Sequence, residues 1–350
     1  MDYLDLIDIS TNEETTFQLD KERRFRDEEN PLEKFSDTEF RQKFRITKAT
    51  FLHLLSLIEE QITRPTARSG AVPPIIQLTT TLRFLATGSY QKVVGDLFGI
   101  SQSTVQRILP PVLESIAALR GGFISMPQGE EQVRVAQKFR ALCSFPGVIG
   151  AIDCTHIRIQ PPDGNTAGLF LNRKIFYSIN TQVICDAECR VLDIVARWPG
   201  STHDSRILQN SCIFSQFEQG KYQQKFLLGD GGYPSKSYLL TPLQKPASDA
   251  ETRYNVAHAR ARNVIEKFFG MWKRKFSILG QDSRIRVKIE TAMTLIVACA
   301  VIHNLAKSEG EPDEGVELDE DSFDQKEGHG EKGATSVRST IISQYFKRTS

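Results

Sequence analysis

The feature that most constrains the fold is a change in hydrophobic period near Gly147. Before it, apolar residues recur at helical spacing, as in the stretch 36–58. After it, apolar runs of strand length alternate with turn residues, first over 147–159 and then over 177–200, where a turn is expected at Asp186–Cys189. Helices in one half and strands with helices in the other are typical of an α+β or α/β protein.

Charge divides the chain in a similar way. The whole sequence carries a net charge of +1, but residues 1–30 carry −6 and residues 306–334 carry −8, so the body 31–305 carries +12. A basic body suits a polyanion such as nucleic acid, although ordinary solvated charge gives the same count. We predict an acidic flexible N-terminus, a helical domain, a second domain with a mixed sheet flanked by helices, and an acidic, mostly disordered tail, over 1–30, 31–140, 147–305 and 306–350.

Two short helices joined by a tight turn are predicted within the helical domain. Apolar residues mark a helix that ends near Phe98, Gly99 suits the position after a helix end, and Ser101 suits the N-cap of the next helix. This is the pattern of a helix-turn-helix, and helical bundles that do not bind DNA show it as well. If the pair binds DNA, the outward side chains of its second helix would contact bases and phosphates; these are Gln102, Ser103, Gln106 and Arg107.

Three carboxylates in the second half stand out by their positions. Asp153 lies inside the first strand-like run, Asp230 ends the apolar run 226–229 just before two glycines, and Glu266 lies on a predicted long helix. Taken singly, the two aspartates are more simply structural or turn residues, and the glutamate is more simply a solvated helix residue. Taken together, a central strand, its neighbour and a packed helix can bring three carboxylates to one point.

Such a set of carboxylates is typical of a metal site. Buried carboxylates are costly unless they are neutralised, and hard oxygen ligands suit Mg²⁺ or Mn²⁺. Two such ions can activate a water and stabilise the leaving oxygen in phosphodiester cleavage. In this interpretation, Gly231 and Gly232 leave room for a DNA backbone to approach Asp230.

Several segments of the chain resemble the harbinger transposase-derived nucleases of the PIF/Harbinger transposase superfamily. The resemblance is carried by GVIGAIDCTHI, FLNRKIFYSIN, WPGSTHDSRIL, LLGDGGYP, YNVAHARARNVIEKFFG and VIHN, and it spans roughly 36–305 in matching order. It implies a DDE endonuclease domain with a ribonuclease H-like fold, with the triad at Asp153, Asp230 and Glu266 holding divalent metal. It also implies a Myb/SANT-like accessory protein that recruits the nuclease to DNA and to the nucleus.

Three side chains near these motifs are accessory candidates with alternative roles. Asp204 is either a further carboxylate of the site or part of a capping box that begins at Ser201. His203 is either a neighbour of the metal or a packing or capping residue. Arg262, one helical turn before Glu266, could hold that carboxylate or a phosphate.

Two function classes remain open. The first is a metal-dependent DNA endonuclease or transposase, and the second is a domesticated DNA-binding protein with little or no nuclease activity that acts through its Myb/SANT-like partner. The N-terminus lacks the pattern of a signal peptide, the longest apolar run, 295–302, is too short to span a bilayer, and the six cysteines form no CxxC pair. We therefore expect a reduced protein of the nucleus and also the cytoplasm, with no membrane partner, that can form a homo-oligomer.

Overall fold

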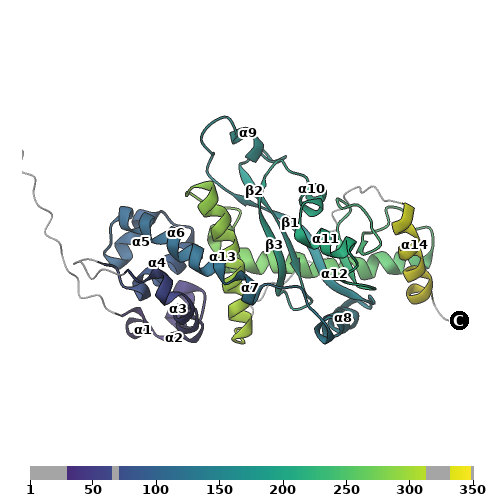
Figure 1. The fold of residues 1–350 in the computed structure, drawn as a ribbon, viewed down its shortest axis with the longest axis horizontal. Helices are drawn as coiled ribbons and strands as arrows, with labels where there is room; N and C mark the ends of the chain where they lie inside the picture. The colour runs from purple at the N-terminus through teal and green to yellow at the C-terminus, as the bar shows by residue number, and fades with distance from the viewer. Residues whose placement is uncertain (1–29, 65–70, 313–331, 348–350) are drawn as a thin grey trace, which may run out of the picture.

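Eight helices make up the first part of the chain. The computed structural model describes residues 30–64, 71–312 and 332–347 (Figure 1). In that first part, the helices are α1 (Pro31–Lys34), α2 (Asp37–Phe44), α3 (Lys48–Ile62), α4 (Pro74–Thr87), α5 (Gln91–Phe98), α6 (Gln102–Ala118), α7 (Arg120–Phe123) and α8 (Glu130–Cys143). Side-chain caps begin two of these helices, because Ser36 forms a capping box with Glu39 and the Thr47 side chain accepts from the Thr50 N–H.

A five-stranded mixed sheet forms the second part. Its strands are β1 (Val148–Arg158), β2 (Ser178–Cys185), β3 (Val191–Pro199), β4 (Phe226–Gly229) and β5 (Leu239–Leu240), in the order β3-β2-β1-β4-β5. The first three strands form an antiparallel meander, and β4 and β5 run parallel to β1. This topology confirms the predicted mixed sheet of the ribonuclease H-like class. The two-residue strand β5 is too short to produce a sequence pattern.

Helices flank this sheet on the route between and after its strands. They are α9 (Ala167–Phe170), α10 (Asp204–Gln209), α11 (Cys212–Glu218), α12 (Asp249–Lys275) and α13 (Ile289–Ser308), followed by α14 (Lys332–Ile341) and a π-helical turn (Ile342–Phe346). The longest, α12, buries Trp272 against Phe268, with ring centroids 5.4 Å apart. On the same helix Phe268 is fully buried, whereas its neighbour Phe269 is only partly buried.

The stretch 204–218 forms two successive helices. Helix α10 ends at Gln209, and the Ser211 side chain caps α11 by accepting from the Phe214 N–H. The expected capping box at Ser201 is wrong, because His203 occupies the N-cap of α10. Asp204 instead accepts a hydrogen bond from Asn180 on β2, at 2.9 Å, so a tertiary partner replaces the local one.

Helix α13 joins the two parts of the structure. It packs against α6 on one side and β3 on the other, and Figure 1 shows it standing between the helical part and the sheet. By length and composition alone this helix could cross a membrane, but 67% of its apolar 18-residue stretch is buried inside the structure. Its surroundings are those of a core helix, and they explain why it is apolar nearly all round.

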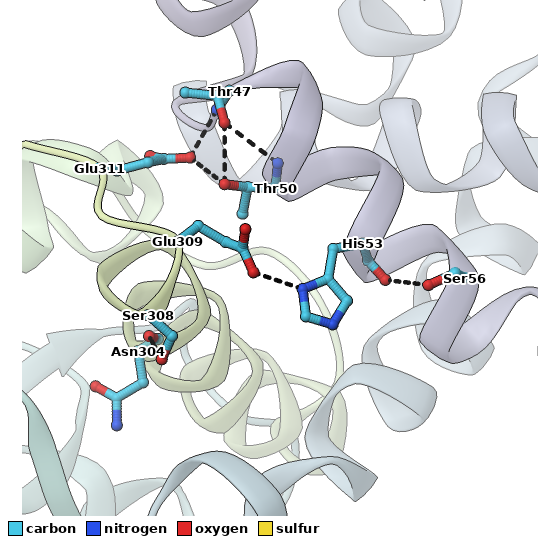
Figure 2. Close-up of polar contacts among 8 residues, drawn as sticks. All are labelled: Thr47, Thr50, His53, Ser56, Asn304, Ser308, Glu309 and Glu311. Carbon is cyan, nitrogen blue, oxygen red and sulfur yellow. Dashed lines mark hydrogen bonds and ion pairs between the residues drawn. The ribbon is translucent and has the colours of Figure 1, made fainter.

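The predicted tail boundary at residue 306 is wrong for the described residues. Helix α13 continues to Ser308, and the residues after it dock on α3 (Figure 2): His53 pairs with Glu309 at 2.7 Å, and the Thr47 N–H donates to Glu311 at 2.8 Å. Residues 309–311 are thus held in place by polar contacts with His53 and Thr47, which no local sequence pattern reveals. The stretch 313–331 and the predicted N-terminal segment up to residue 29 lie outside the described residues.

The end of the chain also packs on the core instead of leaving it. Ile341, Ile342 and Phe346 are buried, and the Phe346 ring lies 5.4 Å from Phe145 and 5.7 Å from Tyr254 between centroids. Figure 1 shows α14 at the end of α12 that lies farthest from α13. Residues 341–346 therefore pack on the core, although they belong to the stretch 306–350 that composition predicts to be mostly disordered.

Truncation after Lys307 is expected to lower the melting temperature by about 5 °C or more. The change removes the buried side chains of Ile341, Ile342 and Phe346 together with both glutamates that dock on α3. Thermal unfolding of the full chain and the truncated chain measures the effect. A second truncation after Pro312 keeps the two glutamates and should recover part of the loss. If neither truncation changes the melting temperature, the removed residues do not stabilise the core, as expected for the disordered tail that composition predicts.

Candidate active site

The register of the sheet brings two of the predicted aspartates to neighbouring positions. Strands β1 and β4 are parallel, and Ile152 pairs with Gly229, so Asp153 and Asp230 are the next residues of two adjacent strands. Both residues are buried, with 8% and 1% of their surface exposed. Buried carboxylates at one level of adjacent strands are unusual in a protein core, because burial favours the uncharged form.

Gly232 explains why the chain turns tightly after Asp230. Its N–H donates to the Asp230 carboxylate at 2.9 Å, and a Cβ added at this glycine would lie 3.0 Å from the same oxygen. Any larger residue would crowd the carboxylate, so the glycine allows the backbone to support it at close range. This local role accounts for Gly232 without the predicted approach of a DNA backbone.

Glu266 is connected to Asp153 through an arginine rather than directly. Arg262 lies one turn earlier on α12 and donates to Glu266 at 2.5 Å, while the same Nη2 atom lies 3.8 Å from the Asp153 carboxylate. The guanidinium is mostly buried, with 17% of its side chain exposed. The prediction that Arg262 holds Glu266 therefore agrees with this geometry. The same arginine also reaches towards Asp153.

The donor set suits a divalent cation, but Arg262 lies between its members. Three carboxylates provide the hard oxygen ligands that Mg²⁺ and Mn²⁺ prefer. Within residues 30–64, 71–312 and 332–347, however, no three His, Cys, Asp or Glu side chains lie close enough together to hold a metal ion. The guanidinium stands where a cation between Asp153 and Glu266 would stand, so the residue types fit a metal and the side chains must rearrange to bind it.

A half-buried lysine, Lys273, lies along the same face of β1 and α12. Thr155 is two residues after Asp153, so both side chains lie on one face of the strand, and Lys273 is seven residues after Glu266, two turns along the helix. The Lys273 ammonium donates to the Thr155 hydroxyl at 2.6 Å. Burial, together with the charge of Lys174, lowers the pKa of Lys273 to about 8. The sequence drew attention to Lys273 only as one of three successive basic residues.

This pKa predicts a stability change at alkaline pH. The folded protein releases the Lys273 proton near pH 8 and the unfolded chain near 10.5, so the unfolded chain binds more protons between these values. The free energy of unfolding should therefore rise between pH 8 and 10.5, by on the order of 3 kcal/mol, and this group should cause no change in it with pH below pH 8. Urea unfolding of wild type and Lys273→Met at pH 7 and pH 10 measures it. Lys245→Met changes an exposed lysine and is the control, which should show the same rise with pH as wild type. If Lys273→Met also shows the full rise, Lys273 is not its cause.

The other accessory candidates lie away from this face. Asp204 lies beside Cys154, whose side chain alternates to the opposite face of β1 from Asp153; burial and then the charge of Asp204 raise the pKa of that thiol. His203 is exposed at the start of α10 and hydrogen-bonds to Ser205 at 3.2 Å, so it is a local capping-region residue in this structure.

His156, also on the opposite face of β1, contacts Ser178 at 3.1 Å. Burial lowers the pKa of His156 to about 4, against the opposing effect of Asp204. The ring is therefore neutral at physiological pH.

The chain is similar to known proteins over most of its length. The family model described as DDE superfamily endonuclease matches residues 152–304, a span that contains Asp153, Asp230 and Glu266. The Bos taurus protein named "Putative nuclease HARBI1" is 34% identical to this chain over 281 residues, which are 80% of this chain and 80% of the relative. HARBI1 of Rattus norvegicus is 32% identical over 330 residues, which are 90% and 92%. The chain belongs to the Harbinger transposase-derived nuclease family.

A likeness to a solved structure is much weaker. The crystal structure of a pre-cleavage Mos1 transpososome aligns with 65% of this chain and 76% of that chain, at 13% identity and a TM-score of 0.18. So low a score supports no argument about this chain. The membership in the Harbinger family therefore rests on the sequence relatives, and DDE endonuclease domains of this kind generally use divalent metal ions.

The predicted helix pair of this Harbinger family member is present in the structure. Gly99 adopts a left-handed conformation with φ of 66° after α5, and the Ser101 side chain accepts from the Thr104 N–H at the start of α6. The inner face of α6 is buried, and the outward residues are exposed: Gln102, Ser103, Gln106 and Arg107. These four side chains are therefore available to a ligand, and their contact with DNA stays a prediction.

Proposed function

We propose that this chain is a metal-dependent DNA endonuclease that hydrolyses phosphodiester bonds. The observation that carries the proposal is the pairing of Ile152 with Gly229, which sets Asp153 and Asp230 on adjacent strand positions within the matched endonuclease segment. Glu266 on α12 completes the set through Arg262. One buried carboxylate within β1, a second directly after β4 and a third on α12 support the triad, provided that the Arg262 guanidinium moves out from between them.

The three carboxylates and Lys273 would have different roles in the proposed reaction. Divalent cations, when bound by Asp153, Asp230 and Glu266, would activate a water and stabilise the leaving oxygen. In this hydrolysis the water oxygen would bond to phosphorus, the bond from phosphorus to one sugar oxygen would break, and a proton released by the water would end on that sugar oxygen, which leaves as a hydroxyl. Lys273, fixed by Thr155 on the same face, would place a positive charge beside the reacting phosphate.

Arg262 has to change partners for this chemistry to begin. Its guanidinium lies beside the carboxylates of Asp153 and Glu266, where it would compete with a divalent cation for both of them. A long, flexible side chain can move away by rotation about its own bonds, and once displaced it could pair with a phosphate oxygen of the substrate. We infer a resting arrangement in which the Arg262 guanidinium stabilises the carboxylates of Asp153 and Glu266.

Conversion of supercoiled plasmid to nicked or linear DNA tests the proposal. We expect conversion in Mg²⁺ or Mn²⁺ and none in EDTA. An Asp163→Asn variant, which changes an exposed aspartate in a loop, is a control and should cleave like wild type. Lack of metal-dependent conversion in a folded protein, with and without the accessory partner, would contradict the proposal.

A DNA-binding protein with little or no nuclease activity is the second candidate. The observation that favours it is the Arg262 bridge, which keeps the carboxylates of the described chain from gathering around a metal. In this case the chain would bind duplex DNA, and Mn²⁺ would bind weakly or not at all. Calorimetric titration of Mn²⁺ separates the candidates, because only the first requires a metal site.

DNA docking through α6 gives a further expected result. Arg107 is exposed near the N-terminus of α6, and its guanidinium contacts only side chains and carbonyls of its own turn, Ser103 and Thr104. If it contacts a phosphate, Arg107→Ala should weaken duplex binding and reduce the slope of log K against log salt by about one. Fluorescence anisotropy at several salt concentrations measures the slope. Arg134→Ala, an exposed arginine on α8, is the control, and equal slopes in all three proteins would remove Arg107 from the interface.

The partner and the cellular location are proposed from the family resemblance. We propose that a Myb/SANT-like protein recruits the chain to DNA and to the nucleus, that some of the chain stays in the cytoplasm, and that it can form a homo-oligomer. Imaging of the tagged chain with and without the partner tests recruitment. A nuclear fraction that does not respond to the partner would contradict it.

A further inference from the structure

The connection between β1 and β2 contains a tight hairpin whose tip is Arg173, Lys174 and Ile175. The Ile175 N–H donates to the Asn172 carbonyl at 3.0 Å, and the Asn172 N–H donates to the Phe176 carbonyl at 3.0 Å. Ile175 has a φ of 61°, in the left-handed region that glycine usually occupies in a hairpin loop of this length. This conformation is unfavourable for a β-branched residue, so the isoleucine strains the backbone at the tip.

Ile175 is also unusually exposed. It is 82% exposed, the largest fraction among the exposed large apolar residues of the described chain. An apolar side chain that stays in water adds no hydrophobic stabilisation to the fold. The isoleucine therefore strains the backbone without burying apolar surface within the described chain, as expected of a side chain that contacts another molecule.

A buried asparagine and an aromatic ring hold the tip in one shape. Asn172 is 5% exposed, and its side-chain oxygen accepts from the Lys174 N–H at 2.9 Å and from the Phe176 N–H at 3.3 Å. The Arg158 guanidinium, at the end of β1, lies 4.2 Å from the centroid of the Phe176 ring. The isoleucine is thus presented by a hairpin that is braced against the sheet.

Two cations flank the isoleucine. Arg173 and Lys174 are exposed, and neither side chain makes a hydrogen bond or an ion pair with any residue that the structure describes. Lys174 also lies near the half-buried Lys273, because burial and then the charge of Lys174 lower the pKa of the Lys273 ammonium. Guanidinium and ammonium groups bind phosphate oxygens, so the tip offers two phosphate contacts beside an apolar side chain.

The hairpin follows the strand that carries Asp153. Asp153 and Arg158 are five residues apart on β1, about 17 Å along an extended strand, and Lys273 reaches Thr155 between them. Figure 1 shows the β1–β2 connection, which contains α9, extending past the end of the sheet. A duplex that runs along β1 from Asp153 would therefore meet the tip about five base pairs or more from the cleaved bond, at 3.4 Å per base pair.

We propose that this tip enters the minor groove of DNA, where Ile175 inserts between two base pairs and Arg173 and Lys174 bind the flanking phosphates. Apolar wedges, isoleucine among them, partly unstack a base step and kink the duplex, and basic residues accompany them in the minor groove. The inference rests on the proposed action on DNA and adds a distortion of the substrate that cleavage by the triad does not itself require.

Fluorescence of 2-aminopurine, a base analogue that brightens when it is unstacked, tests the insertion. The full chain is added to duplexes that carry the analogue at several adenine positions, in EDTA so that no cleavage is needed. Wild type should raise the fluorescence, Ile175→Asn should remove most of the rise, and Ile175→Leu should retain it because leucine is also apolar. Val133→Asn, which changes another exposed apolar residue on α8, is the matched control and should behave like wild type.

The melting temperature of Ile175→Asn should change in the opposite direction. Asparagine adopts the left-handed conformation more readily than isoleucine, so this variant should melt a few degrees higher than wild type. Higher stability together with a lost fluorescence rise is the expected result, because it shows that the isoleucine serves DNA rather than the fold.

Two results would overturn the insertion. One is no fluorescence rise when wild type binds the duplex, and the other is an equal rise in wild type and Ile175→Asn; either would leave the exposed tip to a protein partner. Neither result concerns cleavage. A nuclease that cleaves without the rise contradicts only the insertion, and a protein that shows the rise but does not cleave contradicts only the proposed function.

Discussion

Replacing Asp230 with asparagine will reduce the rate of Mg²⁺-dependent DNA cleavage by about 10³-fold or more, because metal catalysis supplies several kcal/mol and each 1.36 kcal/mol is tenfold in rate. Asp230 is nearly inaccessible, with 1% of its surface exposed, and asparagine has almost the same size. The Gly232 N–H can still donate to the amide oxygen, so the turn should survive. Single-turnover cleavage of a labelled duplex gives the rate.

The control for this experiment has to separate chemistry from folding. Asp163→Asn makes the same chemical change at an exposed position and should cleave at the wild-type rate. The melting temperature of Asp230→Asn should remain within a few degrees of wild type. Cleavage by Asp230→Asn at a rate comparable to wild type would remove this residue from the metal site.

Replacing Arg262 with glutamine should tighten Mn²⁺ binding about tenfold or more. The substitution removes a positive charge that lies 3.8 Å from Asp153 and 2.5 Å from Glu266, where it competes with a divalent cation for the same carboxylates. Mn²⁺ titration followed by calorimetry or electron paramagnetic resonance gives the affinity. Arg260→Gln, two residues earlier and exposed, is the matched control.

The cleavage rate of Arg262→Gln reports on what the arginine does once displaced. If Arg262 only holds the carboxylates in a resting state, the variant cleaves at least as fast as wild type. If it also pairs with the substrate phosphate, the variant binds Mn²⁺ more tightly and yet cleaves more slowly. Weaker Mn²⁺ binding in the variant would contradict the resting arrangement, since it would mean that the arginine supports the metal.

Much of the fold was predictable because it depends on local patterns. The run around Asp153 is rich in β-branched residues and the run before Asp230 is apolar, and their bounds are nearly those of β1 and β4. The caps Ser36, Thr47 and Ser101 act through bonds within three residues, so a short sequence window contains all the information.

The errors arise where distant residues decide the structure. Asp204 pairs with Asn180 instead of capping its own helix, and Glu311 is ordered by Thr47 and Thr50, over 250 positions away. No local pattern contains such partners. For the same reason, the sequence suggested that Arg262 could hold Glu266, four residues away, but it could not show that the guanidinium also reaches Asp153.

Diffraction from crystals soaked in Mn²⁺, collected where manganese scatters anomalously, tests the metal site most directly. We expect an anomalous peak within roughly 2.0–2.2 Å of carboxylate oxygens of both Asp153 and Asp230, with the Arg262 guanidinium displaced from Asp153. A crystal of the Asp230→Asn variant should lose the peak. If the wild type shows no manganese between Asp153 and Asp230 at saturating concentration, and Arg262 still contacts Asp153 and Glu266, these residues do not form the metal centre of a nuclease.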